Sequence, residues 1–182
     1  MSKRIMTGVA SISMGLLLLA GCASMSSRPD WITKGGSAFK DNKKALYGVG
    51  IADSIKSEAL RRTAADNRAI AEISKRLSVM STSLMRDYMS SASVPEEEKT
   101  NGEQYVENTV KTFADNSMSG VKIIDRWDDG KTAYSLAILD VNDLRLMTDD
   151  IKQLSQKTKE YIKANAEKAF DKLEQEQQKQ EK

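Results

Sequence analysis

Residues 45–51 have the sequence ALYGVGI, and this stretch decides what the rest of the fold must do. Apolar side chains alternate along it, as in a half-buried β-strand, with Tyr47, Val49 and Ile51 on one face. The opposite face carries Gly48 and Gly50, whose missing side chains let a neighbouring element approach closely. The stretch therefore predicts a strand with another element packed directly on its glycine face.

The segment that follows predicts a long helix over residues 57–91, with Asp53 or Ser54 as its N-cap. Its first half is rich in small residues: Ala59, Ala64, Ala65, Ala69 and Ala71. Its second half places larger apolar residues three and four positions apart, on one helix face: Ile70, Ile73, Leu77, Met80, Leu84 and Tyr88. We expect the alanine half to lie on the glycine face of the strand.

Two further elements are predicted downstream. Residues 103–116 form a second helix, with Val106, Val110 and Phe113 on one side. Residues 120–141 form a β-hairpin, because Asp129-Gly130 separates two runs of β-forming residues. Both runs are apolar enough that we expect each strand to be buried on at least one face.

The end of the chain predicts a last helix, capped by Asp140 or Asn142, which would run over about residues 142–178 if it is helical throughout. In its first half, apolar residues recur at a heptad-like spacing: Leu144, Met147, Ile151, Leu154 and Tyr161. The second half is dominated by Gln, Glu and Lys. We expect the first half to pack on the domain and the second half to project into solvent, fray or pair with another chain.

The beginning of the chain has the composition of a signal peptide. Lys3 and Arg4 precede an apolar run over residues 8–19 that is too short to span a bilayer. Leu19-Ala20-Gly21-Cys22 resembles the lipobox of bacterial lipoproteins. That resemblance implies cleavage before Cys22, a diacylglyceryl thioether on its sulfur and an acyl group such as palmitate on its amine. An uncleaved anchor, or an ordinary secretory signal that contains a cysteine, is the alternative.

These patterns divide the chain into a signal peptide (1–21), a lipidated cysteine with a flexible tether (22–44), an α+β domain (45–145) and a charged C-terminal helix or tail (146–182). A random chain from residue 22 to residue 46 would span about 25–30 Å. Trp31-Ile32 interrupts the polar tether, and we predict that it docks the tether onto the domain. Contact with a partner or with the lipid interface is the alternative.

Composition excludes several kinds of chemistry. The chain has no histidine and one cysteine, which excludes histidine-activated nucleophiles, zinc sites built on His or Cys, and thiol redox chemistry. The net charge of +2 comes from Lys3 and Arg4, so the chain after the signal peptide has no excess of basic residues to attract nucleic acid. Aromatic residues make up only 5%, so side chains on which bases could stack are scarce. We expect no catalytic residue, cofactor or metal, and we interpret Asp128 and Asp129 as turn residues. A hydrolase that uses only Asp, Glu, Ser and Lys is the enzymatic alternative.

Several motifs occur in a fixed order between residues 29 and 144. They are Pro29-Asp30-Trp31, Tyr47-Gly48-Val49-Gly50, the periodic helix residues Ala65, Ala69, Ile73 and Leu77, Trp127-Asp128-Asp129-Gly130, and Tyr134-Ser135-Leu136-Ala137. Together they resemble the LPP-twenty family of bacterial membrane lipoproteins. The resemblance implies an α+β fold with one long helix on a small three-stranded antiparallel sheet, similar to dodecin-like modules. To this fold the sequence adds the long C-terminal helix.

The same resemblance implies an outer-membrane or surface lipoprotein and not an enzyme, and some relatives build flagellar basal-disc or other envelope assemblies. Ala23 and Ser24 follow Cys22 without an aspartate, which resembles the pattern of outer-membrane sorting in enterobacteria. We expect a structural or protein-interaction role in the periplasm or at the surface. The partners would be the membrane, through lipid on Cys22, and copies of itself or other envelope proteins. The alternative is a tethered module that binds a small molecule or peptidoglycan in a pocket between helix and sheet.

Overall fold

The computed structural model describes residues 27–39, 44–91, 94–95, 99 and 102–180 of the 182-residue chain. The predicted lipobox residues Leu19, Ala20 and Gly21 and the predicted lipidation site Cys22 lie outside the described residues. In the part of the chain that the structure describes, no helix is both long enough and apolar enough to cross a bilayer.

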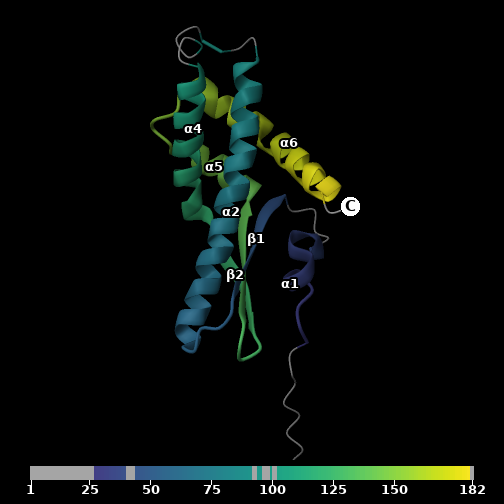
Figure 1. Ribbon diagram of the computed structural model, residues 1–182. Coiled ribbons are helices and arrows are strands. Elements are labelled where there is room, and N and C mark those ends of the chain that lie inside the picture. Colours follow the sequence, from purple (N-terminus) through teal and green to yellow (C-terminus); the bar gives the residue numbers. More distant parts are fainter. Residues whose placement is uncertain (1–26, 40–43, 92–93, 96–98, 100–101, 181–182) are drawn as a thin grey trace, which may run out of the picture.

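The described chain consists of a short N-terminal segment, a strand, two helices, a hairpin and two C-terminal helices (Figure 1). The elements are α1 (Trp31–Lys34), the 3₁₀ helix η1 (Gly35–Ala38), β1 (Ala45–Ala52), α2 (Glu58–Met89), α4 (Gly102–Ser117), the 3₁₀ helix η2 (Met118–Gly120), β2 (Lys122–Asp128), β3 (Ala133–Asp140), α5 (Val141–Thr148) and α6 (Gln156–Gln180). The predicted α+β class is confirmed, because the long helix α2 packs on a three-stranded antiparallel sheet and a long helix ends the chain.

The sheet has the strand order β1-β3-β2, and both pairs of strands are antiparallel. β2 and β3 form the predicted hairpin, in whose turn Gly130 adopts a positive φ of 89°. Asp129 holds this turn, because its carboxylate accepts the backbone N–H groups of Lys131 at 2.9 Å and Thr132 at 2.7 Å. β3 is therefore the central strand and joins the hairpin to β1.

The alanine half of α2 lies on the glycine face of β1, as predicted. A Cβ atom on Gly48 would stand 2.3 Å from the carbonyl oxygen of Ala69. A Cβ atom on Gly50 would stand 1.9 Å from the carbonyl oxygen of Ala65. Both distances are far below van der Waals contact, so only glycine lets the helix backbone come this close.

The N-cap of α2 differs from the prediction. The side chain of Ser57 accepts the backbone N–H of Leu60 at 3.4 Å, so the predicted cap at Asp53 or Ser54 is wrong. Ser54 adopts a positive φ of 60°, which turns the chain before the helix begins. The helix therefore starts one turn after the residues that the capping pattern favoured.

The second half of α2 extends beyond the sheet, and the other helices pack around it (Figure 1). α4 lies beside it and buries Phe113, while Val106 and Val110 are partly buried, as predicted for the helix over 103–116. The largest fully buried side chains among the described residues are Tyr88, Phe113, Ile73, Leu77, Met80, Leu84, Met85, Leu136, Leu139, Leu144, Ile151 and Ile162. The core is thus a sheet at one end and a helical layer at the other, with α2 spanning both.

The single C-terminal helix predicted over residues 142–178 is wrong. The chain forms α5, turns over residues 149–155 and returns as α6 against α2 (Figure 1). The buried stripe of α6 consists of Thr158, Ile162, Ala166, Ala169, Phe170 and Leu173. The expected helix continued the heptad-like spacing of α5 across residues 149–155, which form a turn. It also counted only large apolar residues, whereas alanines such as Ala166 and Ala169 let α6 pack closely on its neighbours. As far as Leu173, α6 belongs to the core and does not project into solvent.

The expected burial of both hairpin strands is wrong for β2. β3 is largely buried, but β2 is an edge strand whose side chains are mostly exposed. Its register shifts between Ile123 and Asp125, and this irregularity leaves Ile124 47% exposed. A bulge together with the exposed charges of Lys122 and Arg126 discourages pairing with a further strand.

Candidate functional site

The described segment nearest to Cys22 packs on the face of the sheet opposite α2. Trp31 and Ile32 are 5% and 8% exposed, and they form an apolar cluster with Tyr47 and Leu136. The indole N–H of Trp31 donates a hydrogen bond to Oδ2 of Asp125 at 2.7 Å. The predicted docking of Trp31-Ile32 onto the domain is therefore confirmed.

Aromatic contacts hold the chain on both sides of α1. The ring of Phe39 stacks on that of Tyr47, with centroids 4.7 Å apart and planes 8° from parallel. The guanidinium of Arg28 lies over the ring of Tyr134, 5.4 Å from its centroid. We call residues 28–39 the docked segment. The random-chain distance predicted from residue 22 to residue 46 does not apply to this part of the chain.

The paired carboxylates of Asp128 and Asp129 both make structural contacts. Oδ2 of Asp128 accepts two hydrogen bonds from Arg61, one from Nε at 3.1 Å and one from Nη2 at 3.0 Å. Arg61 is a buried residue of α2. The backbone N–H groups of Thr132 and Lys131 lower the pKa of Asp129, because they stabilise its ionised form. Asp128 thus ties the hairpin to α2, and Asp129 holds the turn itself. Within the described residues, no cluster of three or more His, Cys, Asp or Glu side chains could hold a metal ion.

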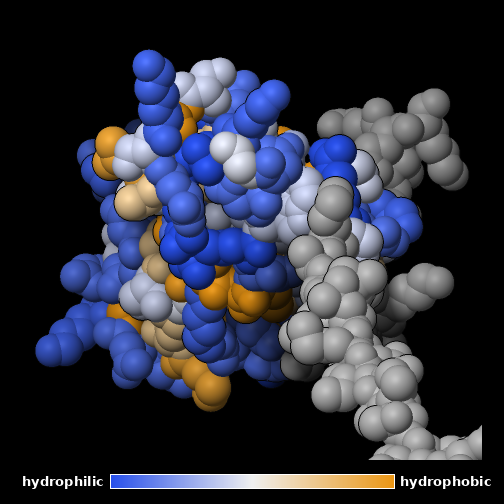
Figure 2. Space-filling model, turned by 90° about the horizontal axis from the view of Figure 1, so that it is seen from below, coloured by the Kyte–Doolittle hydropathy of each residue, from blue (hydrophilic) through white to orange (hydrophobic). Residues whose placement is uncertain are grey.

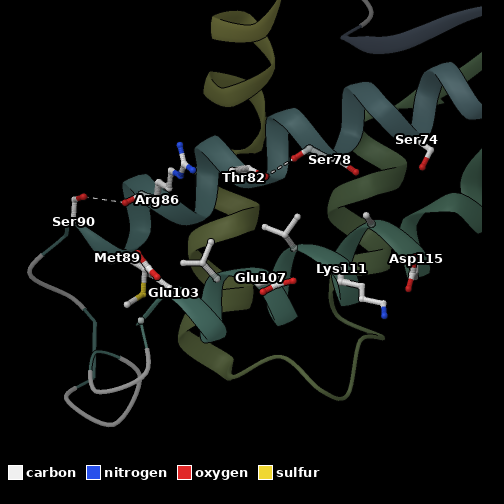
Figure 3. Close-up of a pocket in the computed structure, with 14 residues that line it drawn as sticks. Ser74, Ser78, Thr82, Arg86, Met89, Ser90, Glu103, Glu107, Lys111 and Asp115 are labelled. Carbon is white, nitrogen blue, oxygen red and sulfur yellow. Dashed lines mark hydrogen bonds between the residues drawn. The ribbon is translucent and has the colours of Figure 1, made fainter.

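A groove of ≈ 950 Å³ runs between α2 and α4 and opens to solvent (Figure 3). On the α2 side its polar residues are Ser74, Ser78, Thr82, Arg86 and Ser90. On the α4 side its charged residues are Glu103, Glu107, Lys111 and Asp115. Between these rims lies an apolar strip made by Met89, Val106, Val110 and Ala114. We call this hollow the α2–α4 groove.

The α2–α4 groove exists because short side chains stand where two packed helices usually carry larger ones. Ser74, Ser78 and Thr82 recur at every fourth residue and so line one side of α2. The hydroxyl of Thr82 donates to the carbonyl oxygen of Ser78 at 2.8 Å, which folds it back onto its own helix. Ser90 does the same with the carbonyl oxygen of Arg86 at 2.9 Å. The α2 side is therefore recessed, and Val106 and Val110 of α4 border an open space.

The sequence patterns did not predict this groove. A pocket for a ligand was expected between helix and sheet, but there the backbone of α2 fills the space above Gly48 and Gly50. The signal in the sequence was the four-residue spacing of the short polar residues Ser74, Ser78 and Thr82 along one side of α2. Neither Asp128 nor Asp129, the only carboxylate pair that the sequence analysis considered, lies in the groove.

Comparison with known protein families identifies the class of the chain. The model of the LPP20 lipoprotein family matches residues 29–140, which is more than half of the chain and runs from just before α1 to the end of β3. The protein therefore belongs to the LPP20 lipoprotein family. No curated protein matches the chain significantly. The matched region holds most of the docked segment, the sheet, α2 and α4, whereas α5 and α6 lie beyond it.

Proposed function

We propose that this lipoprotein is anchored by lipid on Cys22 in the bacterial outer membrane and has a structural or protein-interaction role in an envelope assembly, flagellar or other. Three features support the proposal: membership of the LPP20 lipoprotein family, the sequence Leu19-Ala20-Gly21-Cys22, and a docked segment that packs on the domain and begins six residues after Cys22. Catalysis is not part of the proposal, because Asp128 and Asp129 are engaged in holding the hairpin.

The observation that carries the interaction role is the α2–α4 groove. An apolar strip bordered by charged residues suits an amphipathic helix, whose apolar face would meet Val106 and Val110. Glu103 and Glu107 on successive turns of α4 favour basic residues along one rim of that helix. We propose a helix of another envelope protein as the occupant of the groove.

The β2 edge of the sheet is a weaker candidate for the interaction surface. The register shift near Ile124 and the charges of Lys122 and Arg126 oppose strand addition at β2. This argues against self-association through that edge and favours the groove.

Binding of a small molecule or of peptidoglycan is the second candidate. The hydroxyl groups of Ser74 and Ser78 and the guanidinium of Arg86, together on one side of the groove, favour it. Sugars and short peptides present the polar groups that such side chains bind. A ligand of this kind would use the polar side of the groove and leave the apolar strip largely uncovered.

Site-specific photo-crosslinking tests the proposed role. A photoreactive amino acid at Val106 is expected to yield one discrete protein adduct in the membrane fraction, and the same group at the exposed Lys157 of α6 is not. When the photoreactive residue at position 106 is combined with Val110→Arg in one protein, the adduct should disappear while the far-ultraviolet circular dichroism stays unchanged. An adduct of twice the chain's mass would mean self-association. No protein adduct at 106, together with peptidoglycan fragments retained by the protein, would favour the second candidate.

A further inference from the structure

The described chain begins at the hairpin end of the sheet. Arg28 lies over Tyr134, and Tyr134 is close to the turn, one residue after the first residue of β3. The ring of Tyr134 also contacts the ring of Trp127 in β2. In the sheet, Tyr134 of β3 is paired with Ile51 of β1. The docked segment is therefore fixed at its first residue to the end of the domain that carries the β2–β3 turn.

The number of residues between Cys22 and Arg28 limits how far apart they lie. An extended chain spans at most about 3.3–3.6 Å per residue, so the six steps from Cys22 to Arg28 cover no more than about 22 Å. This limit holds for any conformation of the intervening residues. By contrast, α2 has 32 residues and is about 48 Å long at 1.5 Å per residue, so its two ends differ greatly in their distance from Cys22.

The hairpin end of the domain exposes a mixture of aliphatic and basic side chains. Leu60, in the first turn of α2, is 64% exposed, and Ile51, at the end of β1, is 45% exposed. Lys56 and Lys131 are exposed at the same end and line one shallow hollow together with Gly130. Seen from this end, hydrophobic residues lie among hydrophilic ones on the surface (Figure 2). We call Ile51, Lys56, Leu60 and Lys131, with Arg28, the hairpin-end surface.

Several charges of this end are already paired. Arg61 pairs with Asp128 at 3.0 Å, and Arg62 pairs with Glu58 at 2.7 Å. The cations Arg28, Lys56 and Lys131 are also exposed at this end, as are the anions Asp53 and Asp129, of which Asp129 caps the turn. Exposed aliphatic side chains gain by burial at the boundary between headgroups and acyl chains, and exposed cations are attracted to anionic headgroups.

We propose that the hairpin-end surface lies against the lipid bilayer, and that the docked segment holds it there by shortening the tether to the residues before Arg28. This inference rests on the proposed lipidation of Cys22. The far end of α2 and the first turns of α4 then point away from the membrane, which leaves the α2–α4 groove open toward partners in the periplasm or at the surface.

Fluorescence quenching by lipids tests this orientation in the lipidated full-length protein. Because lipid occupies the thiol of Cys22, a single introduced cysteine can be labelled selectively in Leu60→Cys or in the control Gln104→Cys. The control residue is exposed in the first turn of α4, near Met89 at the opposite end of α2. The labelled proteins are placed in vesicles of phosphatidylethanolamine and phosphatidylglycerol that contain a lipid with a quencher on its headgroup.

The expected result is several-fold stronger quenching at position 60 than at position 104. An insertion of about twenty Gly and Ser residues between Ser27 and Arg28 should reduce quenching at position 60 toward that at position 104, because a flexible linker lengthens the reach of the tether. Equal quenching at the two positions in a protein whose mass shows the lipid would overturn the orientation alone. If the mass of the protein in these vesicles shows no lipid on Cys22, the proposed function is overturned as well.

Discussion

The indole N–H of Trp31 and the carboxylate of Asp125 are 2.7 Å apart, although 94 residues separate them in the chain. This hydrogen bond ties the segment that follows the predicted lipidation site to the edge strand of the sheet. The bond is charge-assisted and lies beside the buried rings of the apolar cluster around Tyr47. The segment that sequence composition assigns to a tether is thus partly a structural element of the domain.

Trp31→Ala tests the contribution of this contact to stability. Removing a buried indole leaves a cavity on the sheet, so we expect the free energy of unfolding to fall by about 3–5 kcal/mol. Asp125→Asn keeps the shape but weakens the bond, with an expected loss of about 0.5–1 kcal/mol. Urea denaturation measures both values, with Thr33→Ala on the exposed side of α1 as control. A Trp31→Ala protein as stable as the control would mean that the segment is not docked in solution.

Gly50→Ala tests the close approach of α2 to the sheet. The added methyl group would meet the carbonyl oxygen of Ala65 at 1.9 Å, and a backbone atom cannot move aside as a side chain can. We expect a loss of about 3 kcal/mol in the free energy of unfolding. Gly102→Ala is the matched control, because its methyl group would meet only the flexible end of Met89, at 3.3 Å. Equal stabilities of the two variants, measured by urea denaturation, would contradict the packing of α2 on β1.

Asp66 predicts a specific dependence of stability on pH. Burial raises its pKa, but hydrogen bonds from Arg126 at 2.9 Å and Ser135 at 2.6 Å outweigh burial, so the pKa in the folded protein is lowered. The ionised carboxylate of Asp66 therefore stabilises the fold at any pH above the pKa that an aspartate has in the unfolded chain, about 3.9. This stabilisation is lost as the pH falls through the lower pKa that Asp66 has in the folded protein.

Asp66→Asn should accordingly destabilise the protein at neutral pH by about 1 kcal/mol and flatten its stability profile below about pH 4. Thermal unfolding of both proteins across this range measures the effect. If the two profiles run parallel down to the lowest pH, Asp66 does not contribute to the acid sensitivity of the fold.

Ile162→Ala tests whether α6 belongs to the core. Ile162 is fully buried, so we expect a loss of about 3 kcal/mol in the free energy of unfolding. Lys168→Ala on the exposed side of the same helix should change it by less than about 0.5 kcal/mol. Chemical denaturation distinguishes the two cases. Similar values for both variants would mean that α6 projects from the domain, as the sequence alone predicted.

The parts of the fold that follow from local patterns could be predicted. Gly48 and Gly50 on one strand face and alanines at the start of the next helix specify each other, because a close backbone approach requires small residues on both sides. Asp129-Gly130 likewise specifies its turn from neighbouring residues alone. The docking of Trp31 was also predicted, since a large apolar side chain in a polar stretch gains most by burial.

The parts that depend on distant contacts were not predicted. The turn between α5 and α6 contains no proline or glycine, and the return of α6 is decided by burial of Ile162 and Phe170 against elements far away in the sequence. The exposure of Ile124 arises from a register shift, which alternation along one strand does not reveal. The α2–α4 groove depends on what α4 leaves uncovered, so the spacing of Ser74 and Ser78 indicates a groove only together with the packing of the two helices.

The proposed role depends on lipid at Cys22, and intact-mass spectrometry of the protein isolated from its native membranes tests this most directly. The account predicts a chain that begins at Cys22 and carries the added mass of a diacylglyceryl group and one further acyl chain. It also predicts that Cys22→Ser yields an unprocessed and unlipidated precursor. A wild-type protein that is cleaved normally but has no lipid mass would contradict the account.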